Sequence, residues 1–110
     1  MAYTDLFVDQ GTDFQTNMDL TEDDGTPINV TGYTFSGQIR KSYYSLNPTA
    51  NINITIVNGV SGNVQLSMNS AVTANIAPAR YVYDVIMTDT ANVTIRIIEG
   101  IVTVTPQVTR

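Results

Sequence analysis

The stretch ARYVYDVIMTDTANVTIRIIEGIVTVTPQVTR, residues 79–110, decides the fold class of this chain of 110 residues. It holds two long runs in which apolar and polar residues alternate, 80–88 and 93–105, on either side of the short polar segment DTAN. Alternation with a period of two residues is typical of half-buried β-strands, and two such runs around a short polar segment predict a hairpin. The stretch therefore favours an all-β fold.

The second run of this hairpin changes phase along its length. Val93 and Ile95 belong to one phase, whereas Val102 and Val104 belong to the other, and Gly100 lies within the shifted part. An extra residue in a strand shifts the side chains that follow to the other face of the sheet. The phase change predicts either a β-bulge or a strand that crosses from one sheet to another.

The rest of the chain shows the same alternation. It predicts further strands at 13–20, 33–41, 50–57 and 63–68, and an N-terminal strand around Leu6 and Phe7. Residues 69–76 break the pattern, because Val72 and Ile76 lie four apart, and they predict one short helical turn with Ser70 as its cap. Seven or eight short antiparallel strands with turns every 8–12 residues predict a single immunoglobulin-like β-sandwich over residues 1–110.

Composition excludes several classes of function. The chain has no Cys and no His, so we expect no disulfide, no metal site and no other cofactor, and a Ser-His-Asp triad cannot form. The net charge is −5, and the five basic residues are scattered, so we expect no nucleic-acid partner. No signal peptide and no apolar run of about 20 residues is visible, so we expect synthesis in the cytoplasm and no membrane partner.

The acidic residues do not point to catalysis. Asp84 lies between Val82 and Ile86 on an expected central strand, and we expect it to form a structural ion pair with Arg40 or Arg96. The other acids fall mostly in turns or on outward strand positions, so two facing carboxylates of the glycosidase kind are not expected. The acidic turn around 22–25 lacks the EF-hand spacing and is expected to be solvated. We expect no enzymatic activity.

Aromatic and apolar residues outside the core pattern are candidates for contact with a partner. Tyr43 and Tyr44, in the expected loop SYYSLNPT, either face a partner or fold back onto the core. Tyr81 stands where immunoglobulin-like folds carry their tyrosine corner, and Tyr83 shares its face, so either could be the buried one. The candidate interface residues are Leu6, Phe7, Tyr43, Tyr44, Leu46, Pro106, Val108 and Arg110.

Five blocks of the sequence carry a resemblance to a known protein family. They are VDQGTDFQTNMDL, DGTPINVTGYTFSGQIRKS, GNVQLSMNSAVTANI, ARYVYDVIMTD and RIIEGIVTVTPQVTR. They are similar to small immunoglobulin-like β-sandwich virion proteins of tailed phages, of the type of the N-terminal domain of baseplate upper proteins. The matching positions are Gly25, Gly32, Tyr33, Thr73, Ala74, Arg80, Tyr81, Tyr83, Asp84, Glu99, Gly100, Val104 and Pro106.

The resemblance implies a structural protein of the virion, made in the host cytoplasm. Its place would be the tail, baseplate or neck, or the capsid surface as a decoration. It would act by assembly with other virion proteins, as a homo-oligomer or in a symmetric array. The alternative is a carbohydrate- or receptor-binding module in which the Tyr43–Tyr44 pair and the acidic turn form the site.

Overall fold

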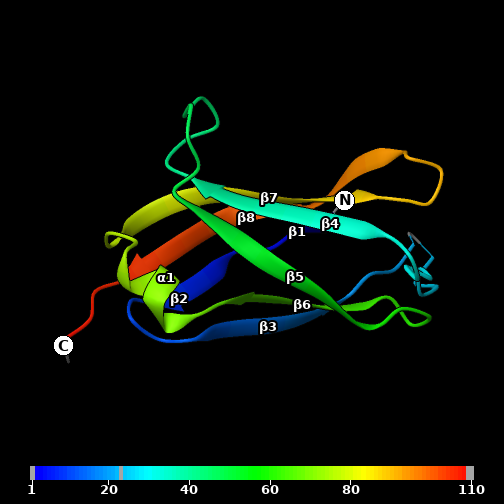
Figure 1. Cartoon of the computed structure of the whole chain (residues 1–110), viewed down its shortest axis with the longest axis horizontal. Helices are drawn as coiled ribbons and strands as arrows, with labels where there is room; N and C mark the ends of the chain where they lie inside the picture. Colours follow the sequence, from blue (N-terminus) through cyan, green and yellow to red (C-terminus); the bar gives the residue numbers. More distant parts are fainter. Residues whose placement is uncertain (1, 23, 109–110) are drawn as a thin grey trace.

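Two β-layers face each other in the computed structural model, which describes residues 2–22 and 24–108 (Figure 1). The strands of the first layer are β1 (Ala2–Tyr3), β2 (Leu6–Asp9), β4 (Thr34–Arg40), β7 (Ala79–Thr88) and β8 (Thr94–Thr105). The second layer contains β3 (Phe14–Asp19) and β6 (Asn63–Met68), and β5 (Ala50–Asn58) belongs to both. One short helix, α1 (Ser70–Ala74), follows β6.

The strand order is that of an immunoglobulin-like sandwich. In the first layer β8, β7 and β4 are neighbours, and in the second β3, β6 and β5 are neighbours. These orders match the B-E-D and C-F-G orders of the two antiparallel sheets of an immunoglobulin fold. The all-β sandwich predicted from the alternation is confirmed. One detail differs, because β1 and β2 run parallel to β8 rather than antiparallel.

Strand β5 joins the two layers by crossing between them. It pairs with β4 as far as the Gly37–Ile52 pair, and from Asn53 onward it pairs with β6. Figure 1 shows it running diagonally from one layer to the other. A Cβ atom on Gly37 would lie 3.1 Å from Cδ1 of Ile54 and 3.3 Å from Cβ of Ile52, so the missing side chain lets β5 pass close to β4.

The phase change in β8 is a β-bulge at Ile97, not a crossing. Val85 pairs with Ile98 and Ile86 pairs with Arg96, so Ile97 has no partner of its own on β7. Ile97 and Ile98 are therefore both buried, and the phase reverses between them. Gly100 has another role, because a Cβ atom there would overlap the carbonyl oxygen of Thr4 as the N-terminal segment passes over it.

Both tyrosines on the inner face of β7 are buried, and each hydroxyl reaches a backbone carbonyl. Tyr81 donates to the carbonyl of Ala77, four residues upstream, which is the tyrosine corner that the sequence predicts. Tyr83 donates to the carbonyl of Thr4 and so ties the N-terminal segment to the sheet. Burial raises the pKa of both phenols.

The helical turn lies within the predicted segment 69–76, but its cap is Asn69 rather than Ser70. The side-chain oxygen of Asn69 accepts a hydrogen bond from the backbone N–H of Val72 at 2.9 Å. The buried Thr73 then fixes the helix to the β2–β3 turn, since its hydroxyl donates to the carbonyl of Thr12 at 2.7 Å. The helix thus closes one end of the sandwich.

Candidate functional site

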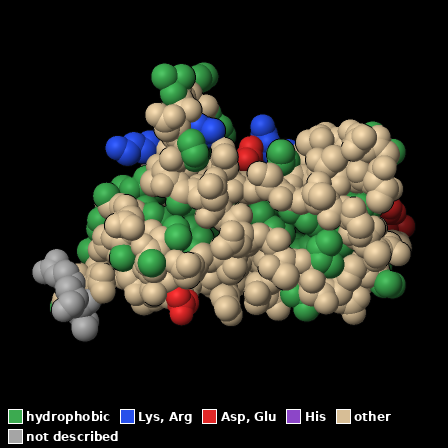
Figure 2. Space-filling model, viewed as in Figure 1, with side chains coloured by type: hydrophobic (Ala, Val, Ile, Leu, Met, Phe, Trp, Pro, Cys, Tyr) green, Lys and Arg blue, Asp and Glu red, His purple; other side chains and the backbone are tan. Residues whose placement is uncertain are grey.

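The loop 41–49 between β4 and β5 projects from the first layer, away from the rest of the molecule (Figure 1). We call it the aromatic loop. Tyr44 is 92% exposed, Leu46 is 94% exposed and Tyr43 is 63% exposed. In Figure 2 hydrophobic side chains cover the tip of this projection, and charged side chains gather at its base. The sequence left open whether these tyrosines fold back onto the core or face outward. Both are exposed at the surface, and neither packs into the core.

A tight turn holds the two tyrosines at the tip of the loop. The N–H of Ser45 donates to the carbonyl of Ser42 at 3.2 Å, so Tyr43 and Tyr44 are the two central residues of a four-residue turn. Arg40, the last residue of β4, donates from Nη1 to the carbonyl of Ser45 at 2.8 Å. The sequence Ser-Tyr-Tyr-Ser after an arginine-terminated strand therefore fixes the tip before any partner binds.

A recess of about 290 Å³ lies below the aromatic loop on the outer face of the first layer. We call it the charged recess; Arg40, Tyr43, Asp84 and Arg96 line it, together with Gln38. The register explains the grouping, because Gln38 pairs with Asp84 and Asp84 pairs with Glu99 across neighbouring strands. Residues opposite each other in a sheet share a face.

The bulge in β8 brings Arg96 and Glu99 onto one face. Residues three apart in a regular strand point to opposite faces, but the extra residue Ile97 shifts the phase between them. Arg96 Nη1 consequently lies 2.6 Å from Glu99 Oε2, and Arg96 Nε lies 3.4 Å from Asp84 Oδ2. The hydrogen bond that Arg96 donates to Glu99, with the Asp84 carboxylate nearby, raises the pKa of Arg96.

Arg40 lines the recess, and it forms no ion pair with an acid among residues 2–22 and 24–108. Its Nη2 donates to Oε1 of Gln38 at 2.9 Å, and its other interaction is with the loop carbonyl of Ser45. Of the two expected partners for Asp84, the structure places Arg96 at ion-pair distance. Both charges are partly exposed, with 40% of the Asp84 side chain and 46% of the Arg96 side chain open to solvent.

Tyr3 is a surface residue of this region that the sequence did not single out. It lies on β1, pairs with Glu99 and is exposed. Partial desolvation, together with the Asp5 carboxylate, raises its pKa. The available signal was the phase that Tyr3 shares with Phe7 on the outer face, but a two-residue strand is too short to show alternation.

The other interface candidates lie apart from the aromatic loop. Leu6 is a correction: it is only 5% exposed and packs in the core, because the alternation of β2 turns Leu6 inward and Phe7 outward. Pro106 and Val108 are exposed beyond the end of β8. Arg110 lies outside the residues that the structure describes.

The acidic turn does not share a site with the tyrosine pair. The N–H of Val30 donates to the carbonyl of Gly59, which places the segment after the acidic turn against the end of β5. The aromatic loop leads into the start of β5. Nine residues of extended chain span about 30 Å, so the two regions lie near opposite ends of this strand, as Figure 1 also shows.

Two further properties bear on function. Among residues 2–22 and 24–108, no helix has the length and apolar character needed to cross a membrane. Within the same ranges, no three His, Cys, Asp or Glu side chains come together as metal ligands would.

Comparisons with known proteins locate the chain at the level of the fold. No curated protein matches its sequence. Among solved structures, it is similar to the Listeria monocytogenes internalin-like protein lmo2027, with 18% sequence identity and a TM-score of 0.49. That alignment covers 92% of this chain, which spans 27% of the length of the other. The family model of the LtfC-like, β-sandwich domain matches residues 2–105. The chain therefore belongs to the LtfC-like β-sandwich domain family.

Proposed function

We propose that the chain is a non-enzymatic structural protein of a tailed-phage virion, which assembles with other virion proteins through the aromatic loop. The observation that carries the assembly role is the nearly complete exposure of Tyr44 and Leu46 on a turn that hydrogen bonds already fix. Tyrosine is among the residues that dominate binding energy at protein interfaces. The assignment to a phage particle rests on the five sequence blocks that resemble such proteins.

The charged recess below the aromatic loop also favours the binding of a protein partner to this part of the surface. Its Arg40 and Arg96 groups are already engaged by Ser45, Gln38, Asp84 and Glu99, so a partner need not supply the missing half of a buried ion pair. A turn that is ordered before binding also loses less conformational entropy on association. The partner surface that fits is an apolar pocket for the loop tip, surrounded by polar groups.

A symmetric assembly has further surfaces to use. The first layer ends at β1 and β2 and the second at β3, so both sheets present edge strands. Edge strands offer unpaired backbone groups to another chain. We propose that copies of the chain, or neighbouring virion proteins, cover these edges in the particle.

The carbohydrate-binding alternative does not gain from the loop. The site expected for it combines the tyrosine pair with the acidic turn, and the length of β5 separates these two regions.

Immunogold electron microscopy tests the proposal. Antibody raised against the purified chain is applied to phage particles from lysates of the organism that encodes it. We expect label at one fixed place, such as the tail tip, neck or capsid. Absence of label from both intact and disrupted particles would overturn the virion role.

A further inference from the structure

A groove without basic residues follows the outer side of β5 and β6. One part, of about 540 Å³, lies where β4 and β5 diverge, and a second, of about 280 Å³, lies toward β3. Asn53 and Ser67 line both parts, so the two form one continuous groove. We call it the neutral groove. The residues used in the argument are Gln15, Phe35, Asn51, Asn53, Thr55 and Ser67.

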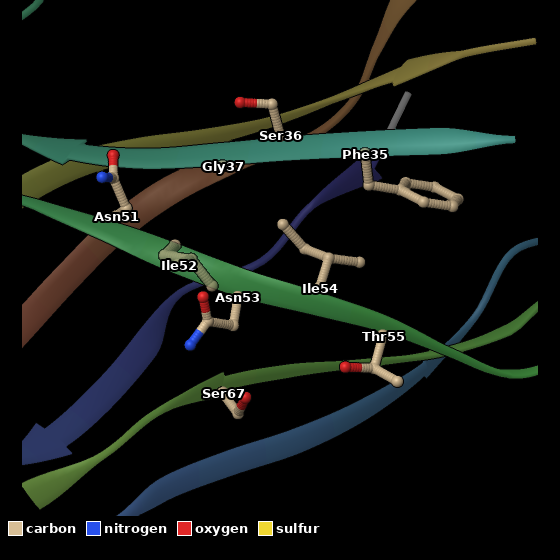
Figure 3. A pocket seen from close by; sticks show the side chains of 9 residues that line it. All are labelled: Phe35, Ser36, Gly37, Asn51, Ile52, Asn53, Ile54, Thr55 and Ser67. Carbon is tan, nitrogen blue, oxygen red and sulfur yellow. The ribbon is translucent and has the colours of Figure 1, made fainter.

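The groove exists because β5 changes layers. The pairing of β4 with β5 ends at Gly37–Ile52, while residues 34–36 of β4 continue along β7. A wedge therefore opens between the two strands, and Figure 3 shows Phe35 and Ile54 within it. The alternation of β5 turns Asn53 and Thr55 to the outer side, and Ser67 of β6 lies next to Asn53 in register.

Five of the polar side chains that line the groove are free to bind, whereas Asn69 and Asp13 already accept hydrogen bonds from α1. Within residues 2–22 and 24–108, no hydrogen bond to the protein engages the side chains of Gln15, Asn51, Asn53, Thr55 or Ser67. Carboxamides and hydroxyls each offer both donors and acceptors. This differs from the charged recess, where the polar groups hold one another.

The charge of the lining selects the class of ligand. In the described part of the chain no Lys or Arg lines the groove, so a phosphate or another anion has no counter-charge there. The carboxylate that lines it, Asp13, already accepts the N–H of Ser70 at 2.7 Å. A ligand that matches free donors and acceptors without charge is a polyhydroxylated one, and the ring of Phe35 adds an apolar surface for the face of a sugar.

We propose that the neutral groove binds an uncharged oligosaccharide. Asn53 and Thr55 follow one another along β5, at the spacing of about 7 Å between alternate residues of a strand, and Figure 3 shows both pointing toward β6, whereas Asn51 points the other way. Asn53 and Thr55, with Ser67 beside Asn53, can bond successive hydroxyl groups along a sugar chain. The inference is independent of the assembly role, because none of the residues that line the groove belongs to the aromatic loop.

A titration with defined sugars tests the proposal. The probes are neutral oligosaccharides of glucose, galactose, mannose, rhamnose and N-acetylglucosamine, added to the ¹⁵N-labelled protein and followed by NMR. We expect at least one to bind with a millimolar Kd or tighter and to shift the amide signals of residues 51–55 and of Ser67. The double variant Asn53→Ala with Thr55→Ala should weaken that binding about tenfold or more, since both side chains lose their hydrogen bonds to the sugar.

Matched variants separate the groove from other surfaces. Asn17→Ala removes an exposed amide from the same outer face, outside the groove, and should leave the affinity unchanged. Tyr43→Ala should also leave it unchanged. The proposal is overturned if no sugar in the panel binds, or if Asn17→Ala or Tyr43→Ala weakens binding as much as the double variant does. It is also overturned if only extended peptides bind and shift residues 34–36, because the groove would then accept a β-strand.

Discussion

The charged recess and the neutral groove are both hollows on the outer surface of the same sandwich, but their polar groups are used differently. In the recess, Arg40 and Arg96 are bonded to neighbouring side chains and to the loop backbone. In the groove, Asn51 and Asn53 make no side-chain hydrogen bond to the described part of the protein. A bonded network stiffens a surface, whereas free amides leave hydrogen bonds to be made with a ligand.

Two irregularities of the sheets create this difference. The bulge at Ile97 places Arg96 and Glu99 on one face and so builds the recess. The change of layer by β5 opens the groove next to Gly37. Each hollow therefore depends on a separate departure from regular pairing, and each can be altered without the other.

The largest change in stability is expected from Gly100→Ala, which disturbs β8, the strand that carries Arg96 and Glu99 of the charged recess. The added Cβ would overlap the carbonyl of Thr4, which also accepts the Tyr83 hydroxyl, so β1 must move away from β8. We expect a loss of about 3 kcal/mol in the free energy of unfolding, measured by urea denaturation. The NMR signals of the groove residues 51–55 should keep their positions.

A glycine without close neighbours is the control for this variant. Gly25 has a positive φ, 87°, unlike Gly100, but nothing lies within 4 Å of its Cβ position. Gly25→Ala should therefore cost only about 1 kcal/mol, from backbone strain. Equal costs at the two glycines would contradict the close approach of Thr4.

Alkaline pH should lower the free energy of unfolding of the whole sandwich. The recess and the groove should therefore be lost together, because both depend on the core that contains the buried tyrosines. Burial raises the pKa of Tyr81 and Tyr83 above the value near 10 of an unfolded phenol. Their contribution to stability is complete below about pH 10 and is lost as the pH rises toward their folded-state pKa. Each buried tyrosine should then cost about 1.4 kcal/mol per pH unit, measured by unfolding at several pH values.

The variant Tyr83→Phe tests whether Tyr83 contributes to this loss of stability at alkaline pH, since it removes one of the two titrating groups. The variant loses about 1 kcal/mol at neutral pH, with its hydrogen bond to Thr4. Its stability should nevertheless fall less steeply above pH 10 than that of the wild type. An identical slope would show that Tyr83 does not titrate with unfolding.

The double variant Tyr44→Ala with Leu46→Ala should weaken assembly and leave the neutral groove unchanged. Both side chains are almost fully exposed, so the free energy of unfolding should change by less than about 0.5 kcal/mol. Loss of two anchors at an interface should cost about 2 kcal/mol of binding to the partner, or roughly thirtyfold in Kd. Isothermal titration with the partner, once identified from the particle, measures this change.

The smallest effect is expected from Asp84→Asn in the recess. Its ion pair with Arg96 is partly exposed, and Arg96 keeps its shorter contact with Glu99. We expect a loss of at most about 0.5 kcal/mol in urea denaturation, smaller still at high salt. A loss above about 2 kcal/mol, independent of salt, would mean that Asp84 is part of a buried network.

The sequence predicted the regular parts of the molecule well, because alternation reports directly on which face of a strand is buried. The strands, the helical segment and the tyrosine corner follow from local patterns. The neutral groove could not be predicted, because the outward phase of Asn51 and Asn53 does not reveal that β5 leaves β4. The position of Leu6 was misjudged for a related reason: its burial depends on parallel pairing with β8, a contact 96 residues away in the sequence.

The most direct test of the assembly role is quantitative mass spectrometry of gradient-purified particles. The particles come from cells that supply either the wild-type chain or the Tyr44→Ala, Leu46→Ala variant. The account predicts the wild-type chain at a fixed ratio to the major virion proteins, and the variant at a level lower by about tenfold or more. Particles that lack the wild-type chain, or that contain both forms equally, would contradict it.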